Sequence, residues 1–517
     1  MPSMTEIDQG MNPRTGQAVG APVAHTSLAE VDRSARAAAM AAPALAGLSL
    51  GRRADLLRAV AGALEDARAE LVALADAETG LGTGRLDGEL TRTTVQLEMF
   101  AEVVADGSVV DAIIDYADPA AKPPRPDLRR MLVPLGPTAV FAASNFPFAF
   151  SVAGGDTASA LAAGCPVLVK AHPGHPGLSA AVADIVVKAL TRAGAPDGTF
   201  AVVHGFDAGR ALLTHPAVAA AAFTGSIAGG RALLDLANAR PEPIPFYGEL
   251  GSLNPTVVTP AAVASRGADI AAGFVASYTL GSGQFCTKPG LLFLPAEHGL
   301  TEALVAQTTA VELGPLLNRR IQDGFSVMAD ELARTAGVRR LTLPSIVESP
   351  GYGVSSVLLA VSAGDLIRAT TLLEECFGPA ALVVEYGSVE ELVAALDVLP
   401  GSLTASLHAD QETEPELAGA LLARLSARAG RVVWNGWPTG VAVTWAQHHG
   451  GPWPATTAPL HTSVGVTAIR RFQRPLVWQN VPEPLLPEAL REANPLDLPR
   501  RVNGRIHNGH AASPVGC

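Results

Sequence analysis

The sequence is poor in cysteine, and its few cysteines are far apart. They are Cys165, Cys286, Cys376 and Cys517, with no CxxC pair and no cysteine–histidine cluster at the spacing of a zinc site. This pattern excludes a disulfide framework, and free thiols fit a reducing compartment. Each cysteine therefore has to be judged by its own surroundings.

Positive charge and long apolar runs are also scarce. Lysine and arginine number 37 against 49 acidic residues, a formal charge of −12, which argues against a nucleic-acid partner because phosphate binding needs a basic surface. No apolar run reaches the roughly 18 residues of a membrane span. The N-terminal segment carries Glu6 and Asp8 where a signal peptide has an apolar core, and Cys517 does not complete a prenylation motif. The expected location is the cytoplasm.

What the chain does have is length and apolar residues. Its 517 residues are 48% apolar, enough for two or three domains with large cores. Ser27 followed by Glu30 predicts a helix N-terminus with a capping box. The stretch from Ala117 to Pro137 is rich in proline and is expected to be an extended crossing or linker. Apolar periodicity predicts helices over residues 27–46, 52–78 and 90–104.

From Thr138 onward, short apolar runs alternate with helical stretches. Strands are expected at 139–142, 166–171, 200–203 and 218–223, and helices at 153–163, 179–193, 207–214 and 227–239. A second block has strands near 290–294, 354–359, 381–385 and 403–407. This rhythm predicts an α/β fold with doubly wound, mostly parallel sheets. Ligands bind beyond the carboxyl ends of such strands, so the chemistry is expected just after each strand.

One cysteine lies in a segment suited to a nucleophile. Cys286 follows Gly281, Ser282 and Gly283, small residues that allow a sharp turn and the close approach of a substrate. An accessible thiol presented in this way can attack a carbonyl carbon. The alternative is a small buried cysteine beside a turn, the commoner fate of a lone cysteine.

Candidate side chains also follow the other strands. Asn145 can hold an oxyanion with its amide, or simply form a turn. Lys170 can bind a ribose hydroxyl or a phosphate, or be solvated at a strand end. Gly225 and Ser226 lead into a helix whose free N–H groups can bind a pyrophosphate. Glu249 lies between glycines in an apolar stretch, where desolvation would raise its pKa and suit it as a general base; a capping or ion-paired glutamate is the alternative.

These residues occur in the order and spacing of a known family. The motifs that resemble the aldehyde dehydrogenase superfamily, over roughly residues 10 to 490, are Asn145-Phe146-Pro147, Lys170, Phe223-Thr224-Gly225-Ser226, Glu249-Leu250-Gly251, Gly283-Gln284-Phe285-Cys286 and Glu374-Glu375-Cys376-Phe377-Gly378-Pro379. The segments 144–151, 170–173, 92–97, 479–482 and 485–490 look more closely like its α-ketoglutaric semialdehyde (2,5-dioxovalerate) dehydrogenase branch, which also holds an NADP-dependent fatty aldehyde dehydrogenase.

The resemblance implies roles for the site residues. Cys286 is the expected nucleophile, Asn145 and the Cys286 backbone N–H are the expected oxyanion donors, and Glu249 is the expected base that activates water. No metal is expected. The residues implied to bind a nicotinamide cofactor are Lys170, His172, Pro173, Arg210, Gly225, Ser226, Gly230, Glu375 and Phe377.

The cofactor preference rests on one departure from the family pattern. Many NAD-preferring members carry a glutamate three residues after the equivalent of Lys170, and that carboxylate repels a 2′-phosphate. Here the position is Pro173. NADP is therefore slightly favoured over NAD, with Arg210 as a positive partner for the phosphate.

The implied reaction is oxidation of an aldehyde to a carboxylic acid through a cysteine thiohemiacetal and thioester. The favoured substrate is α-ketoglutaric semialdehyde, and the alternative is a fatty or other aliphatic aldehyde. Two further alternatives are a CoA-acylating dehydrogenase, which generally lacks the base at Glu249, and a silent binding or structural member. A carboxylate-bearing substrate needs a cation or several donors. Arg92 and Gln96, four residues apart on a helix, are candidates together with Phe148, and an exposed helix face is the alternative.

The resemblance also implies the domains and the partners. Residues 1–110 and 131–252 are assigned to a cofactor-binding domain and 253–432 to a catalytic domain. Residues 111–130 and 433–475 are expected to form an arm that joins the subunits of a homodimer or homotetramer. Residues 476–517 form a C-terminal extension, and its small polar end is expected to be mobile. The expected partner is a small-molecule aldehyde.

Overall fold

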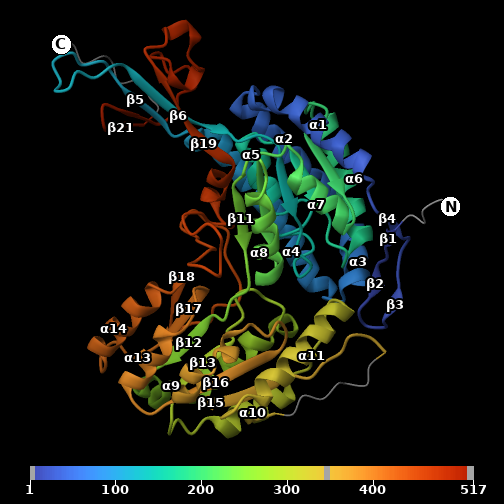
Figure 1. The fold of residues 1–517 in the computed structure, drawn as a ribbon, viewed down its shortest axis with the longest axis vertical. Coiled ribbons are helices and arrows are strands. Elements are labelled where there is room, and N and C mark those ends of the chain that lie inside the picture. The colour runs from blue at the N-terminus through green and yellow to red at the C-terminus, as the bar shows by residue number, and fades with distance from the viewer. Residues whose placement is uncertain (1–5, 343–349, 509–517) are drawn as a thin grey trace.

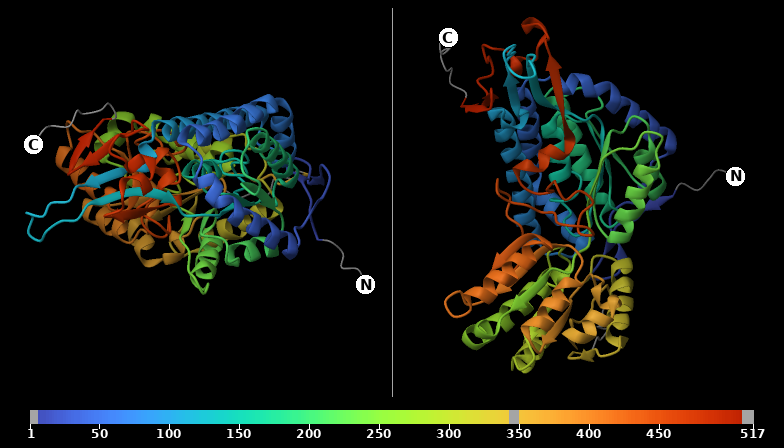
Figure 2. Two further views of the ribbon diagram at one scale, coloured as in Figure 1. Left: turned by 90° about the horizontal axis from the view of Figure 1, so that it is seen from above. Right: turned by 60° about the vertical axis from the view of Figure 1, so that its left-hand side comes forward.

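The computed structural model describes residues 6–342 and 350–508. Cys517 and the polar segment 509–517, which the sequence predicts to be mobile, lie outside the described residues. The chain forms two α/β lobes and an arm of β-sheet at the top of Figure 1. The right-hand view of Figure 2 shows that the N-terminal lobe lies between the arm and the second lobe.

The N-terminal lobe is built on a parallel sheet with the strand order β11-β10-β7-β8-β9. Its strands are β7 (Thr138–Phe141), β8 (Val167–Lys170), β9 (Phe200–Val203), β10 (Ala220–Thr224) and β11 (Phe246–Glu249). In β8, Val167 and Val169 pack into one apolar cluster and Leu168 packs into another, as the period of two along a strand requires. Both faces of the sheet are therefore buried, which explains the continuous apolar runs in the sequence.

Two groups of helices cover this sheet. On one face lie α2 (Leu50–Asp66), α4 (Thr83–Asp106), α5 (Gly155–Ala163) and α6 (Pro176–Arg192), and on the other α1 (Leu28–Ala46), α7 (Phe206–Thr214) and α8 (Ile227–Asn238). The predicted α/β fold with a doubly wound parallel sheet is confirmed. Two short antiparallel strand pairs precede α1. In the outer pair β1 (Ile7–Asp8) pairs with β4 (Val23–Ala24), and in the inner pair β2 (Met11–Asn12) pairs with β3 (Gln17–Ala18).

The helix boundaries confirm one prediction and correct two. Ser27 and Glu30 form the predicted capping box. The single helix predicted over 52–78 is wrong, because the chain forms α2 and then α3 (Arg68–Thr79) with a break at Ala67. Both helices bury leucines on the same side, so the apolar pattern continues across the break. Helix α4 begins well before the predicted start at residue 90, since its first residues are exposed and show little apolar periodicity.

The second lobe has the strand order β14-β15-β16-β13-β12-β17-β18, and only the β14–β15 pair among these neighbours is antiparallel. Its strands are β12 (Pro255–Val258), β13 (Leu291–Pro295), β14 (Arg339–Arg340), β15 (Val357–Ser362), β16 (Ala380–Tyr386), β17 (Ser402–His408) and β18 (Ala429–Trp434). The sequence did not predict β11, β12, β14 or β18. All four residues of β12 are buried, so this short strand shows no alternation of apolar and polar residues.

Helices cover both faces of the second sheet as well. They are α9 (Pro260–Thr279) and α10 (Thr301–Ala310) on one face, and α11 (Arg319–Arg334), α12 (Ala363–Arg368), α13 (Val389–Asp397) and α14 (Pro415–Ser426) on the other. The strands β12 and β13 are parallel neighbours in the middle of this sheet, and the segments that precede them lie on the side of the N-terminal lobe (Figure 1).

The arm unites the proline-rich crossing with the end of the described chain. Its strand order is β19-β6-β5-β20-β21, from β5 (Ala112–Asp115), β6 (Leu128–Pro134), β19 (Gln473–Gln479), β20 (Arg500–Val502) and β21 (Arg505–His507). Much of the segment 433–475, which the sequence assigned to the arm, lies elsewhere, because its middle packs against Glu249. The division into domains and the use of the arm in self-association stay predictions.

Candidate active site

The strands of the N-terminal sheet end at one edge, which faces the second lobe (Figure 1). Lys170 is the last residue of β8, Thr224 of β10 and Glu249 of β11, and Asn145 lies shortly after β7. Because the neighbouring strands are parallel, these residues gather at the same edge. The structure therefore brings together candidates that are far apart in the chain.

The loop that precedes Cys286 has an unusual backbone. Gly281, Ser282 and Gly283 have positive φ angles of 57°, 57° and 68°, a region that residues other than glycine rarely adopt. At Gly283, a Cβ atom would overlap the carbonyl of Gly378. Only glycine lets this loop, residues 281–286, pack so closely on the segment 374–379.

Two buried side chains tie this loop to its surroundings. Asn254 donates from Nδ2 to the carbonyls of Cys286 and Lys288, both at 2.8 Å, and its Oδ1 accepts from Thr404 N at 3.1 Å. The Lys288 Nζ donates at 2.8, 3.1 and 2.8 Å to the carbonyls of Cys376, Gly378 and Ala380. Asn254 and Lys288 thus hold the chain around Cys286 and the segment 376–380 in place, and sequence reasoning assigned no role to either.

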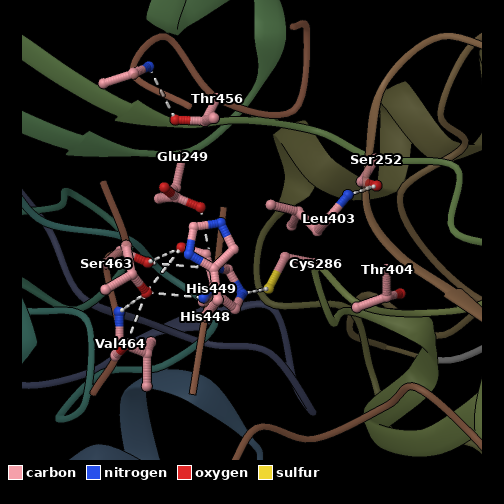
Figure 3. A network of polar contacts seen from close by, with 12 residues as sticks. Glu249, Ser252, Cys286, Leu403, Thr404, His448, His449, Thr456, Ser463 and Val464 are labelled. Carbon is pink, nitrogen blue, oxygen red and sulfur yellow. Dashed lines mark hydrogen bonds and ion pairs between the residues drawn. The ribbon is translucent and has the colours of Figure 1, made fainter. Parts of the chain in front are cut away.

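Cys286 lies beside a histidine that the sequence analysis missed (Figure 3). The Cys286 Sγ is 3.4 Å from Nε2 of His449, and Nδ1 of the same ring is 3.0 Å from Oε2 of Glu249 and 3.1 Å from Oγ of Ser463. The side chains of His449 and Glu249 are only 2% and 7% exposed. A chain of contacts therefore runs from the thiol through the imidazole to the carboxylate.

The electrostatics of this chain favour a charged histidine ring. Burial opposes that charge, but the charge of Cys286, the hydrogen bond with Cys286 and the contact with Glu249 outweigh it and raise the pKa of His449 to about 10. Burial raises the pKa of Glu249, against the opposing effect of its hydrogen bond with His449. At neutral pH the His449 ring is therefore positively charged, and both of its nitrogens are donors.

The segment that carries His449 runs along the end of β11. Leu250 N donates to Ala455 O at 2.8 Å, and Glu249 forms an isolated β-bridge with Thr456. His449 is 163 positions from Cys286 in the chain and stands in a stretch without periodicity. The signal that could have found it is a histidine directly before two glycines, a place where the backbone can turn a side chain toward a site.

Asn145 lies close to the loop of residues 281–286. Its Nδ2 donates to Gln284 O at 3.0 Å, and its own carbonyl accepts from Nη2 of Arg85 at 2.7 Å. Gln284 lies two residues before Cys286. Because an amide nitrogen carries two N–H donors, one of them is left for an oxyanion on a substrate attached to Cys286.

Lys170 is buried, which contradicts the alternative of a solvated lysine. Its Nζ lies 4.8 Å from the centroid of the Phe206 ring and donates to Ala171 O at 2.8 Å. Burial lowers the pKa of Lys170 to about 8, and the charge of Asp8 opposes this shift. The ammonium has three donors, so two remain for ribose hydroxyls.

The N-terminus of α8 is open, as an anion site requires. Gly225 and Ser226 are exposed there, and Ser226 is the N-cap whose hydroxyl accepts from the first turn. The Oγ1 of Thr224 has no hydrogen-bond partner among the described residues. A Cβ at Gly230 would overlap the Leu250 side chain, so Gly230 allows α8 to pack against the end of β11.

The Glu375 side chain lies near the start of α8. A Cβ atom at Gly251 would overlap the Glu375 carboxylate and lie 3.4 Å from Ile227 at the start of α8. Burial raises the pKa of Glu375 to about 7, while the charge of Lys288 opposes this shift. Phe377, two residues further on, is half-buried.

Three other cofactor candidates lie beyond β8 and on α7. His172 accepts from Gly174 N at 3.0 Å with its Nδ1, so its ring stabilises the turn that contains the half-buried Pro173. Arg210 is exposed on α7, one turn after Phe206. In the part of the chain that the structure describes, the Arg210 side chain forms no hydrogen bond or ion pair.

The three substrate candidates differ in their surroundings. The Arg92 guanidinium lies 5.2 Å from the centroid of the Phe150 ring. Gln96 is 3% exposed and packs against Gly155, and Phe148 is 2% exposed in the core of the N-terminal lobe. Arg92 and Gln96 therefore do not lie on an exposed helix face, and the alternative that placed them there is wrong.

This arrangement fits a dinucleotide cofactor. The open start of α8 with the free Thr224 hydroxyl suits a pyrophosphate, and Lys170 and Glu375 suit ribose hydroxyls. Among residues 6–342 and 350–508, no group of three or more His, Cys, Asp or Glu side chains is placed to hold a metal ion. Over the same ranges, no helix has both the length and the apolar surface that a membrane crossing needs.

Comparison with known proteins agrees with this geometry. The model of the "Aldehyde dehydrogenase family" matches residues 3–452. Alpha-ketoglutaric semialdehyde dehydrogenase 2 of Azospirillum brasilense is 46% identical over 504 residues, which cover 96% of each chain. Alpha-ketoglutaric semialdehyde dehydrogenase of Acinetobacter baylyi is 41% identical over 500 residues, 96% of this chain and 95% of the relative.

A solved structure shows the same fold. The crystal structure of PnpE from a Pseudomonas species, in complex with nicotinamide adenine dinucleotide, has a TM-score of 0.78 at 24% identity, over 94% of this chain and 96% of that chain. The family resemblance drawn from the motifs is thereby confirmed. This chain belongs to the aldehyde dehydrogenase family.

Proposed function

We propose that this protein oxidises α-ketoglutaric semialdehyde to α-ketoglutarate with a nicotinamide dinucleotide. The observation that carries the proposal is the chain of contacts from Cys286 through His449 to Glu249, in which a thiol and a buried carboxylate contact the same imidazole ring. The choice of substrate is supported by the two relatives at 46% and 41% identity, whose names specify this semialdehyde.

The first step is attack by Cys286 on the aldehyde carbon. The charged His449 ring donates its Nε2–H to the sulfur that attacks. A C–S bond forms and the carbonyl oxygen becomes an oxyanion. Asn145 Nδ2 and the Cys286 backbone N–H stabilise that charge, and the product is a thiohemiacetal on Cys286.

The second step is hydrolysis, with Glu249 as the base. When bound, the nicotinamide supplies the oxidation by accepting hydride from the thiohemiacetal carbon, which leaves a thioester on Cys286. Glu249 takes a proton from water, the resulting hydroxide attacks the thioester carbon, and the Cys286 thiolate departs. Burial raises the pKa of Glu249, which makes its carboxylate a stronger base. His449 stabilises the departing thiolate.

Residues from both lobes would hold the cofactor. Gly225 and Ser226 present the N-terminus of α8 to the pyrophosphate, where free N–H groups and the helix dipole favour negative charge. Lys170 and Glu375 would bind the hydroxyls of the two riboses. Phe377 would pack beside the nicotinamide.

We propose a slight preference for NADP over NAD. Pro173 provides no carboxylate to repel a 2′-phosphate, and Arg210 is exposed one turn after Phe206, whose ring lies over Lys170. Asp8 acts in the opposite direction, because its negative charge is felt at Lys170. The two effects oppose each other, so we expect the preference to be small.

A kinetic panel tests the substrate, the cofactor and the fate of the thioester together. It measures kcat/KM for α-ketoglutaric semialdehyde, succinic semialdehyde and hexanal, with NAD and with NADP, in the presence and absence of CoA. We expect the highest kcat/KM for α-ketoglutaric semialdehyde, use of NADP at least equal to that of NAD, and no effect of CoA. A preference for hexanal, a strong preference for NAD or a requirement for CoA would each contradict the corresponding part of the proposal.

The role of His449 gives a prediction about the reactivity of the thiol. In a His449→Gln variant, the rate of Cys286 alkylation by iodoacetamide at pH 7 should fall about tenfold to a hundredfold, the equivalent of one hydrogen bond to a charged group. The pKa of His449 is raised to about 10, so the ring is charged below that pH and neutral above it. Because iodoacetamide reacts with the thiolate, the difference between wild type and variant should shrink once the pH is high enough to ionise the thiol in both proteins.

His448 offers a matched control for this measurement. It adjoins His449 but makes no contact with Cys286 among the described residues, and burial lowers its pKa. His448→Gln should therefore alkylate at the wild-type rate across the same pH range. If His448→Gln and His449→Gln slow the reaction equally, the effect belongs to the fold of this segment and not to the Cys286–His449 contact.

A further inference from the structure

A stripe of charged residues on α4 runs beside the proposed reaction centre. Arg85, Glu89 and Arg92 are spaced by four and three positions, so they share one face of the helix. Glu89 is 5% exposed, and its Oε1 accepts from the backbone N–H groups of Phe148 and Ala149 at 2.9 and 3.0 Å. The stripe is thus attached to the loop that follows β7.

The Arg85 side chain already contacts other residues of the protein. Its Nη2 donates to the carbonyl of Asn145 at 2.7 Å, and its guanidinium lies 5.2 and 4.8 Å from the ring centroids of Phe146 and Phe285. Phe285 directly precedes Cys286. Arg85 therefore supports the proposed oxyanion donor and the loop of residues 281–286 from behind.

Arg92 makes no comparable polar contacts among the described residues. Its side chain forms no hydrogen bond or ion pair with the described residues, and its Nη1 is buried without an acceptor. The guanidinium lies over the Phe150 ring, whose centroid is 6.2 Å from that of His449. Burial lowers the pKa of Arg92, while the charges of Glu89 and Cys286 oppose this shift, so the cation is within electrostatic reach of the sulfur. A buried donor without an acceptor costs free energy, and a ligand carboxylate would remove that cost.

A second cation near Cys286 is less available. Arg431 on β18 also feels the charge of Cys286. Its Nη1 donates to Gly440 O at 3.0 Å and its Nη2 donates to Pro438 O. Because Arg431 holds the segment 438–440 in place, Arg92 is the better candidate to receive an anion.

We propose that Arg92 binds the carboxylate at the far end of the substrate and so selects ω-oxo acids over uncharged aldehydes. The inference rests on the proposed function, since it requires the aldehyde carbon at the Cys286 sulfur while the carboxylate meets the guanidinium. The forked donors of arginine match a carboxylate with two parallel hydrogen bonds. The rings of Phe146 and Phe150, 5.4 Å apart between centroids, offer an apolar surface to the methylene groups between the two ends.

The test compares Arg92→Met and Arg92→Lys with the wild type on α-ketoglutaric semialdehyde and hexanal. In Arg92→Met, the ratio of kcat/KM for the semialdehyde to kcat/KM for hexanal should fall about a hundredfold, as expected for the loss of a charge-assisted bidentate pair. The change should appear mainly in KM, because the carboxylate is bound equally before and during reaction. Arg92→Lys keeps the positive charge but loses the paired donors of the guanidinium. In this variant the same ratio of kcat/KM values should fall about tenfold. An unchanged ratio in both variants overturns the inference.

Arg85→Met is the matched control on the same helix face. Because Arg85 supports Asn145, this variant should lower kcat/KM for both aldehydes alike and leave their ratio unchanged. A wild type that oxidises hexanal but not the semialdehyde would refute the proposed substrate. A wild type that oxidises the semialdehyde, with Arg92→Met at the same ratio, would refute only the role of Arg92.

A measurement that needs no turnover provides an independent readout. α-Ketoglutarate, the proposed product, should protect Cys286 of the wild type from iodoacetamide and should fail to protect Arg92→Met at the same concentration. Arg92→Met should also unfold close to the wild-type Tm, since Glu89 keeps its two backbone hydrogen bonds. Protection that persists in Arg92→Met contradicts the inference.

Discussion

Replacing Cys286 with serine is expected to lower kcat by at least about 10⁴-fold, because a single reacting group carries the covalent pathway. A serine hydroxyl keeps its proton at neutral pH, so it is a far weaker nucleophile than a thiolate at the same place. The measurement is NAD(P)H formation at saturating aldehyde and cofactor. Intact-mass spectra of the wild type during turnover should show one acyl adduct, located on Cys286.

Cys165→Ser provides the control for this substitution. The Cys165 Sγ is buried 3.3 Å from Phe472 O, and a serine hydroxyl can donate to the same carbonyl, so activity should stay near that of the wild type. Burial raises the pKa of Cys165 and raises that of Cys376 to about 12, so neither thiol is a nucleophile at neutral pH. An acyl adduct on Cys376, or full turnover by Cys286→Ser, would contradict the assignment of the nucleophile.

Replacing Glu249 with glutamine is expected to separate the two halves of the reaction. Glutamine keeps the shape of the side chain but cannot accept a proton from water, so steady-state kcat should fall about 10²- to 10⁴-fold, the usual contribution of a general base. Attack by Cys286 does not require that base. Stopped-flow traces should therefore retain a burst of NAD(P)H, close to one equivalent per site, followed by slow turnover.

Hydroxylamine adds a second readout to the Glu249→Gln experiment. It attacks a thioester without the help of a base, so it should restore turnover in the variant far more than in the wild type. Glu78→Gln is a matched control, because Glu78 is also a buried carboxylate but accepts from the backbone of Gly177 and Leu178. Loss of the burst in Glu249→Gln would mean that Glu249 acts earlier, through its contact with His449.

Most of the N-terminal lobe could be predicted from local patterns. The strands β7 to β10 are apolar runs because both faces of their sheet are buried, and the helices between them alternate with those runs in the sequence. Of the strands in the two main sheets, β11, β12, β14 and β18 escaped prediction. In β12, four buried residues stand directly before a helix, and such a run has neither the length nor the alternation that identifies a strand.

Part of the candidate site was also predictable. Asn145, Glu249 and Cys286 stand in motifs with residues that suit their chemistry, and the strand ends where Lys170 and Ser226 lie follow from the α/β rhythm. The family resemblance then linked these motifs into one mechanism. The sequence also suggested Arg92 as a cation for a carboxylate, although the choice between a buried and an exposed helix face stayed open.

Other parts of the site depend on contacts that no local pattern encodes. His449 comes 163 positions after Cys286, and it reaches the sulfur only because the segment around Thr456 runs along the end of β11. Packing likewise decides that the Arg92 guanidinium has no hydrogen-bond acceptor. Arg85 on the same helix face, by contrast, donates to Asn145 and lies over two aromatic rings.

By itself, the sequence determined the α/β class through its periodicity and the family through the order of its motifs, and it suggested the residues proposed to attack the aldehyde and to activate water. The tertiary structure decided which histidine stands beside Cys286, how deeply Lys170 is buried and which arginine of α4 is left without a hydrogen-bond acceptor. Those properties are distances, burial and unsatisfied hydrogen bonds. They exist only after segments far apart in the chain have packed against one another.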